Sequence, residues 1–347
     1  MIDFRYHIVS IVAVFLALAI GIVLGSTELQ GNTIDGLRSL SNSLNNQLSN
    51  ARSQLNSYQE LSGASDTFLA GAEAKLVGGY LAGDRLVLVT EPGASSSVIS
   101  GVKQAAGLAG ATVTGTVALQ PKFNDLSGAT QSNLSAINQQ EAASNGTSLA
   151  SPAASQTLYQ QQAAQLIGTA ILDQNAGQLG LSSSQAQLLL QAYAQAGYLN
   201  VSGTVTNRAT LAVIVTPQAA PSDGSSDPAS QVLLAVATQF ATASAATLVT
   251  GPSAASAASG SAISVLRGSS VSSQVSSVDN ADTTLGQISS VWALATQLAG
   301  GKPNSYGISG ASAVSPAVPS VPSVTASPSS TPSTKATGKV KQTVGNK

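Results

Sequence analysis

Residues 85–93 read RLVLVTEPG, and this stretch decides the fold. RLVLVT contains an uninterrupted apolar run, which indicates a strand buried on both faces of a sheet. The EPG that follows is typical of a turn. Residues 96–108 then show a helical pattern, and residues 111–119 begin a second strand. This order of strand, helix and strand predicts an α/β protein with a parallel sheet.

The same order recurs later in the chain. LAVIVTP at 211–217 predicts a strand, residues 230–243 a helix and ATLVTGP at 246–252 another strand. The fragments ATVTG and ATLVTG stand at matching places after the two helices, which favours a repeated unit. The remaining expected elements are strands at 262–268 and 275–279 and a helix at 283–298.

Between the two copies lies a segment that is rich in Gln and Ala. Its pattern predicts helices at 125–143, 155–171 and 182–197. We therefore expect a Rossmann-like parallel-sheet domain at 84–310 with a helical insertion at about 125–200. Residues 311–347 are rich in Pro and Ser and show no period, which predicts a disordered tail.

The N-terminal region begins with a short head, residues 1–7, before the apolar run IVSIVAVFLALAIGIVL at 8–24. This run contains no charge and approaches the ~20 residues that a membrane span needs. Its one small-x-small cleavage pattern, at 19–21, is followed by further apolar residues. An uncleaved signal-anchor at 8–25 therefore fits better than a cleaved signal peptide.

The orientation of this anchor follows from the basic residues on its two sides. Arg5 and the N-terminal amine precede the run, and Arg38 is the first basic residue after it. The positive-inside rule then places the N-terminus inside. We expect a single-pass membrane protein of the cell envelope, bound to membrane lipid through residues 8–25, with its α/β domain exported.

A second helix is predicted at 34–62, where apolar residues recur at steps of three or four. They are Ile34, Leu37, Leu40, Leu44, Leu48, Ala51, Leu55, Tyr58 and Leu61. Asn, Ser and Gln fill the gaps, so the apolar stripe needs a partner surface. Two interpretations stay open. The stripe forms a coiled coil that makes a homo-oligomer through residues 34–61, or it packs on its own domain.

The composition is poor in charge. Only 8% of the residues are charged and the net charge is −1, so neither a nucleic acid nor an acidic membrane surface is indicated as a partner. The chain has no Cys, which excludes disulfides, thiolate metal sites and thiol nucleophiles.

A candidate ligand-binding site lies where two expected strands end, because α/β sheets bind ligands at the carboxyl ends of their strands. No GxGxxG follows a strand and no GxxxxGK[ST] is present. The simpler interpretation is that these tight turns only reverse the chain. The candidate residues are Thr90, Glu91, Pro92, Gly93, Thr216 and Pro217.

The sequence contains no recognisable set of catalytic residues. His7 is the only histidine, and it borders the apolar run. A Ser-His-Asp or Cys-His arrangement is thus excluded in the domain, and no carboxylate pair stands out by its spacing. We therefore expect that the protein is not an enzyme, and that it has no catalytic residues, no cofactor and no resident metal ion.

The segment VFLALAIGIVLGS at 14–26, followed by a Leu-spaced helix, resembles the mycobacterial copper-transport protein B family of actinobacteria. Agreement continues at Asp84-Arg85, AGATVTG (109–115), Val278-Asp279, Gly286 and Tyr306-Gly307, over about residues 1–310. The resemblance implies an envelope protein of copper homeostasis, described as an outer-membrane channel that lowers intracellular copper.

The metal-ligating residues limit how such a protein would handle copper. Cu(I) prefers thiolate and thioether ligands, whereas this chain offers only Met1 and His7. Copper is therefore expected as a transported species and not as a tightly bound ligand. Two functions remain open: a component of copper efflux, and a non-catalytic envelope scaffold with no direct metal binding.

Overall fold

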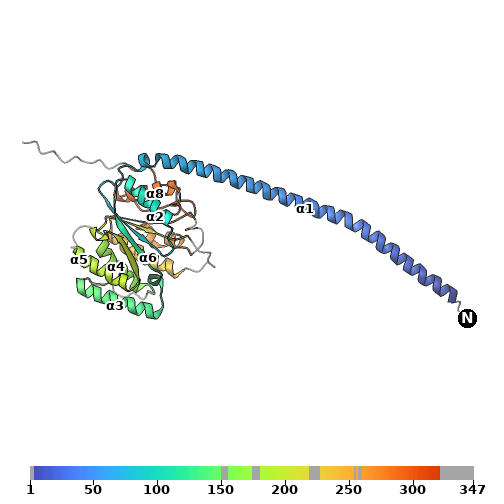
Figure 1. Ribbon diagram of the computed structural model, residues 1–347, viewed down its shortest axis with the longest axis horizontal. Coiled ribbons are helices and arrows are strands. Elements are labelled where there is room, and N and C mark those ends of the chain that lie inside the picture. The colour runs from blue at the N-terminus through green and yellow to red at the C-terminus, as the bar shows by residue number, and fades with distance from the viewer. Residues whose placement is uncertain are drawn as a thin grey trace, which may run out of the picture. The chain divides into compact units, whose positions relative to one another are not determined.

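The computed structural model describes residues 4–149, 155–173, 180–218, 227–253, 255–256 and 260–320. The chain divides into two compact units, one ending at Phe68 and the other beginning at Leu69. An apolar helix opens the chain, and the second unit contains a seven-stranded, mostly parallel sheet flanked by helices (Figure 1). The α/β class predicted from the sequence is confirmed.

The first helix, α1, runs without interruption from Phe4 to Val77. The sequence interpretation placed two separate helices here, at 8–25 and 34–62, and both lie within α1. The reason is that no proline occurs before Pro92, and isolated glycines weaken a helix by only about 1 kcal/mol each. The helix ends at a Gly pair, of which Gly79 has φ = 82°.

The sheet has the strand order β3-β2-β1-β4-β5-β6-β7. All neighbours are parallel except β2 and β3. The strands are β1 (Arg85–Thr90), β2 (Thr112–Leu119), β3 (Leu199–Gly203), β4 (Leu211–Val215), β5 (Ala246–Thr250), β6 (Ser276–Val278) and β7 (Ser305–Tyr306).

The central strands β1, β4 and β5 are buried along nearly their whole length. This burial explains their continuous apolar sequences, because helices cover both faces of the sheet. One face packs against α2 (Ser96–Leu108), α8 (Thr284–Leu298) and the last turns of α1. The single tryptophan, Trp292, belongs to this layer and donates from Nε1 to the carbonyl of Leu76 at 3.0 Å.

The opposite face is covered by the remaining helices, with α4 and α6 in contact with each other (Figure 1). They are α3 (Gly128–Asn145), α4 (Leu158–Ile171), α5 (Ser183–Gln195), α6 (Pro228–Ala243) and α7 (Ala262–Arg267). The helices expected at 125–143, 155–171 and 182–197 correspond to α3, α4 and α5. Their packing includes a buried hydrogen bond from Tyr193 Oη to Asn138 Oδ1 of 2.7 Å.

Three further elements differ from the sequence interpretation, one of which is the short edge strand β7 (Ser305–Tyr306), which was not predicted. The segment at 262–268 was expected to be a strand, but it forms helix α7, because Ile263 and Leu266 are spaced by three and bury one helical face. The edge strand β3 was not predicted. Its sequence, LNVSG, has only one buried residue and lacks the apolar run that marks the central strands.

Candidate functional site

The strand order reverses between β1 and β4, which pair in parallel at the centre of the sheet. The chain leaves β1 through α2 on one face and leaves β4 toward α6 on the other. In open α/β sheets, the crevice beyond the carboxyl ends of two such strands is the usual place for a ligand. Both candidate loops from the sequence begin here.

The structure brings these two loops together. The backbone amide of Glu91 donates to the carbonyl of Val215 at 2.9 Å, directly after the paired ends of β1 and β4. Gly93 has φ = 83°, and a Cβ atom built on it would lie 3.6 Å from Cβ of Pro217. The loops are therefore side by side, although they are more than 120 residues apart in the sequence.

The polar groups at this place are mostly buried. Thr90 and Thr216 are nearly inaccessible, and the backbone amide of Thr216 donates to the carbonyl of Thr250 at 2.8 Å. Thr216 Oγ1 contacts the same carbonyl at 3.3 Å. Thr216 thus helps to join β4 to β5, and Thr90 pairs through its backbone with Ala118 of β2 and Val215 of β4, so these two residues can offer little to a ligand.

Glu91 is the unusual member of the set, with only 6% of its surface exposed. Burial, and secondarily the negative charge of Asp227, raise the pKa of its carboxyl group to about 8. Asp227 caps the N-terminus of α6 by accepting from the amide of Ala229 at 3.2 Å. At neutral pH most Glu91 side chains therefore carry a proton and can donate a hydrogen bond.

A second buried carboxylate, Asp279, follows β6 and was not predicted as a site residue. Arg267 Nη1 lies 2.9 Å from its Oδ2 atom, and both side chains are buried. The backbone amides of Ile308 and Ser309 donate to the carboxylate at 2.7 and 2.9 Å, and the Ser256 hydroxyl also donates to it.

These contacts set the charge state of Asp279. Burial alone raises the pKa of its carboxyl group, but the hydrogen bonds from Ser256, the two backbone amides and Arg267 outweigh that effect and hold the pKa below its usual range. Arg267 also donates to the carbonyl of Tyr306 at 2.7 Å. The cluster holds the chain around β7 against the sheet. The polar atoms of the ion pair are engaged in these contacts and are not available to bind a substrate, so the role of the cluster is structural.

A metal centre is not formed by the residues that the structure describes. Among them, no three or more His, Asp or Glu side chains gather in a group that could hold an ion. His7 lies on α1 with its side chain exposed.

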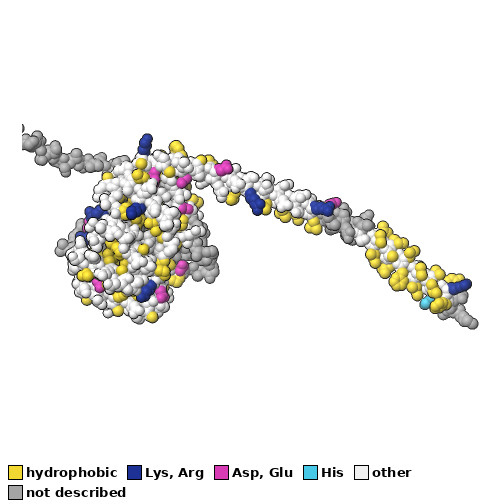
Figure 2. Space-filling model, viewed as in Figure 1, with side chains coloured by type: hydrophobic (Ala, Val, Ile, Leu, Met, Phe, Trp, Pro, Cys, Tyr) yellow, Lys and Arg dark blue, Asp and Glu magenta, His cyan; other side chains and the backbone are white. Residues whose placement is uncertain are grey.

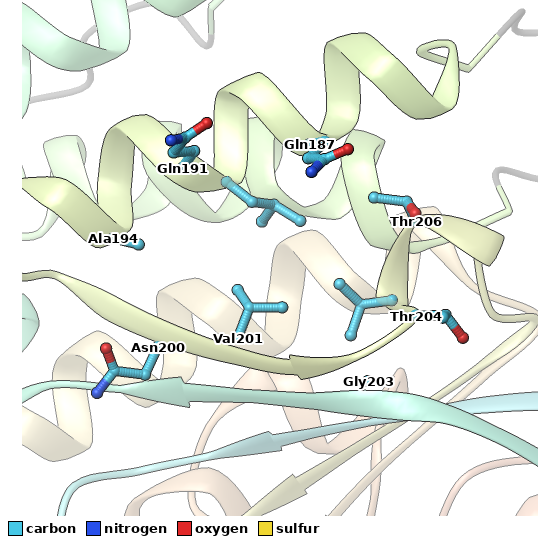
Figure 3. A pocket seen from close by; sticks show the side chains of 10 residues that line it. Gln187, Gln191, Ala194, Asn200, Val201, Gly203, Thr204 and Thr206 are labelled. Atoms are coloured by element: carbon cyan, nitrogen blue, oxygen red, sulfur yellow. The ribbon is translucent and has the colours of Figure 1, made fainter.

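A hollow of the second unit lies elsewhere, between α5 and the edge strand β3 (Figure 3). Its volume is about 730 Å³. Gln187 and Gln191 of α5 lie on one side, and Val201 of β3 points toward them from the other. None of the ten lining residues is charged.

In the first unit, the segment Phe4–Ser26 of α1 is long and apolar enough to cross a membrane, judged by length and composition. All its described side chains are exposed, and Figure 2 shows hydrophobic side chains gathered over it. Among the described helices it is the one segment that meets this criterion.

Comparison with known proteins gives a consistent result. Residues 1–316 match the model of a family described as "Copper transport outer membrane protein, MctB". The chain is 31% identical to the copper transporters MctB of Mycobacterium bovis and Mycobacterium tuberculosis, over 88% of this chain and 96% of theirs. It is 30% identical to the copper transporter MctB of Mycobacterium leprae, over 89% of this chain and 96% of that protein.

Proposed function

The chain belongs to the MctB family of copper transport outer membrane proteins, and we propose that it acts in copper efflux and homeostasis from the cell envelope. The observation that carries this proposal is the family match, which runs from residue 1 to residue 316 and so includes both the apolar helix and the sheet domain. Relatives of nearly the same extent are named as copper transporters and not as enzymes.

The proposed arrangement at the membrane follows from the apolar segment. Residues 8–25 anchor the protein in lipid, residues 1–7 stay inside, and the α/β domain at 84–310 is exported. The exposed apolar surface of Phe4–Ser26 supports this, because in water it would remain uncovered. Arg5 before the segment gives the orientation.

The apolar stripe of residues 34–61 is proposed as a homo-oligomer contact. Its leucines are about half to two-thirds exposed, for example 65% at Leu37 and 49% at Leu48. A row of exposed leucines at helical spacing is typical of a coiled-coil seam. A second copy of the same helix would bury it.

The pair of adjacent loops formed by residues 90–93 and 216–217 is proposed as a contact for a ligand or a partner. It lies at the reversal point of the strand order. Glu91 supports the proposal, since a buried, protonated carboxyl group can donate a hydrogen bond that an ionised one cannot.

A second candidate function is favoured by the absence of soft metal ligands. With no Cys, one Met and one His, the chain can serve as an envelope scaffold or interaction protein that never binds copper directly. In the transport function copper passes as cargo, whereas in the scaffold function another protein moves it. Conductance of the purified full-length protein in planar lipid bilayers separates these two, because a scaffold alone carries no ion current.

The copper function itself is tested in cells whose own copy of the gene is deleted. We expect these cells to accumulate copper and to grow poorly in raised copper. The full chain and the control variant His7→Ala should restore growth, while a chain lacking residues 1–26 should not, because the anchor sets the location. Unchanged copper content in the deletion strain would contradict a role in efflux and leave the scaffold function.

A further inference from the structure

A polar hollow lies at the edge of the sheet where β1 begins and where the chain enters β4. Its volume is about 400 Å³, which is within the range of small-molecule sites. Its lining includes Arg85, the first residue of β1, then Arg208 shortly before β4, and the start of α5. The loops at 90–93 and 216–217 follow the other ends of β1 and β4, so this hollow is separate from the contact proposed there.

The lining concentrates positive charge in a chain that has little of it. Residues 69–320 contain three arginines, and two of them line this hollow. Among the described lining residues the one acidic group is Asp173, whose Oδ2 atom accepts from Arg85 Nη2 at 2.8 Å. Two arginines and one aspartate leave an excess of one positive charge, so the hollow favours an anion.

The guanidinium of Arg208 has no hydrogen-bond or ion-pair partner among the described residues. It is partly buried and packs on the backbone of Gly180, because a Cβ atom built on Gly180 would overlap its Nη1 atom. Arg85 Nε donates to the backbone carbonyl of Arg208, which keeps the two arginines together. An arginine that is held in this way loses little conformational entropy when it binds an anion.

The start of α5 adds uncharged donors to the same lining. Ser182 caps the helix, and its hydroxyl accepts from the amide of Gln185 at 3.3 Å. The amides of Ser183 and Ser184 come before the first intrahelical bond, so the helix itself gives them no acceptor. Such amides favour a negatively charged group, and here they supplement the two arginines.

The donors belong to three elements, which suits a phosphate group better than a carboxylate. Arg85 opens β1, Arg208 precedes β4 and Ser183 opens α5. A carboxylate has two oxygens, and a single arginine can engage both of them with parallel hydrogen bonds. A phosphate monoester has three free oxygens and can therefore accept from all three elements at once.

A second hollow meets the first at Thr206. This residue also lines the uncharged hollow of about 730 Å³ between α5 and β3 (Figure 3). Gln187, Gln191 and Thr204 offer amide and hydroxyl groups there. Because these groups can both donate and accept, they suit the hydroxyl groups of an uncharged molecule attached to the phosphate.

We propose that the polar hollow binds the phosphate group of a small, hydroxyl-bearing phosphate monoester. Arg208, Arg85 and the start of α5 hold the phosphate, and the rest of the molecule lies toward Gln187. Free inorganic phosphate offers the same charged group, and a comparison of affinities separates the two sources. The site is independent of the copper function and of the loops at 90–93 and 216–217.

The measurement is isothermal titration calorimetry of the full-length protein in detergent with glucose 6-phosphate. The buffer is free of phosphate and has a pH of about 7.5, where the ligand is mostly a dianion. We expect one molecule bound per chain. Arg208→Gln should weaken the binding about tenfold or more, because it removes charge-assisted hydrogen bonds. The matched control Lys103→Gln removes an exposed positive charge of α2 and should leave the affinity unchanged.

Gly180→Ala tests the geometry of the site without changing any charge. The added methyl group would displace the guanidinium of Arg208, so the affinity should fall. Its control is Gly107→Ala, where a Cβ atom meets nothing within 4 Å. Urea unfolding followed by the fluorescence of Trp292 establishes that each variant is folded. Full affinity in a folded Gly180→Ala variant would contradict the role of Arg208.

Three further ligands complete the test. Glucose 6-phosphate should bind more tightly than inorganic phosphate, and neither glucose nor acetate should bind. If inorganic phosphate binds as tightly as the ester, the hollow beside α5 contributes nothing and the assignment to a monoester is wrong. If neither phosphate compound binds, if acetate binds as tightly as they do, or if Arg208→Gln and Lys103→Gln have equal affinities, the hollow is not a phosphate site.

Discussion

The carboxylate of Asp279 occupies the space that a side chain on Gly307 would need, since a Cβ atom built on Gly307 would overlap Oδ1 of Asp279. Gly307 also has φ = 126°, a conformation that other residues rarely adopt. Because Gly307 has no side chain, the backbone comes close enough to Asp279 for the amides of Ile308 and Ser309 to donate to its carboxylate. The buried ion pair with Arg267 is thus completed by a chain segment that only glycine allows to come so close.

Gly307→Ala should lower the free energy of unfolding by about 3 kcal/mol, because it adds backbone strain and disturbs the hydrogen bonds of a buried charge. The measurement is urea unfolding followed by the fluorescence of Trp292, the only tryptophan of the chain and a member of the same domain.

The control for this substitution is Gly107→Ala. Gly107 lies in α2, and a Cβ atom there meets nothing within 4 Å. That variant should gain up to about 1 kcal/mol from the better helix propensity of alanine. If Gly307→Ala and Gly107→Ala were equally stable, the space between residue 307 and the carboxylate of Asp279 would be large enough for a methyl group, which would contradict this account.

The buried carboxyl group of Glu91 predicts how stability depends on pH. Its pKa is 4.5 in an unfolded chain and about 8 in the folded protein, so the folded state binds the extra proton between these values. Stability should therefore fall as the pH rises from about 4.5 to 8, by up to about 1.4 kcal/mol per pH unit. Glu91→Gln removes the titrating group and should flatten this slope.

The control is Glu60→Gln, which changes an exposed carboxylate on α1. It should leave the slope as in the original protein. Unfolding curves recorded between pH 5 and 8.5 would decide the matter. If Glu91→Gln and the original protein lose stability in parallel, the carboxyl group of Glu91 is already ionised in the folded state.

The leucine stripe on α1 predicts self-association of the full-length protein. Replacing Leu40, Leu44 and Leu48 with Asn should weaken it strongly, because each leucine buried in a coiled coil contributes about 1.5–3 kcal/mol. The measurement is the molar mass in detergent, corrected for bound detergent, across a range of protein concentrations.

The matched control exchanges three residues on the opposite side of the helix for the same residue type. It is the triple variant Ser49→Asn, Ser53→Asn and Ser57→Asn. The control should associate like the original protein. Loss of association in both variants would point to a general weakening of the helix, and retention in both would mean that this stripe is not the contact.

The sheet was predictable where burial is complete on both faces. Under that condition only a continuous run of Val, Leu and Ile satisfies the packing, and β1 and β4 carry this pattern. The half-exposed β3 lacks the pattern and was missed. The segment of α7 was assigned to a strand because a short apolar run is compatible with either structure until its packing is known.

The site was predictable only in part. The turn after β1 and the turn after β4 were identified because parallel strands end at one edge of a sheet, and the structure places them side by side. The cluster of Arg267, Asp279 and Gly307 was not identified as a unit. Arg267 ends α7, whereas Asp279 and Gly307 directly follow β6 and β7, and no local spacing in the sequence predicts a contact between them.

The central claim is that this protein serves copper transport without holding copper at a dedicated site. The most direct measurement is a titration of the purified full-length protein and of His7→Ala against a chromogenic Cu(I) chelator. We predict that neither protein withdraws copper from the chelator, since the chain contains no Cys, one Met and one His. Uptake of one equivalent of Cu(I) by the full-length protein, in competition with the chelator, would contradict the claim.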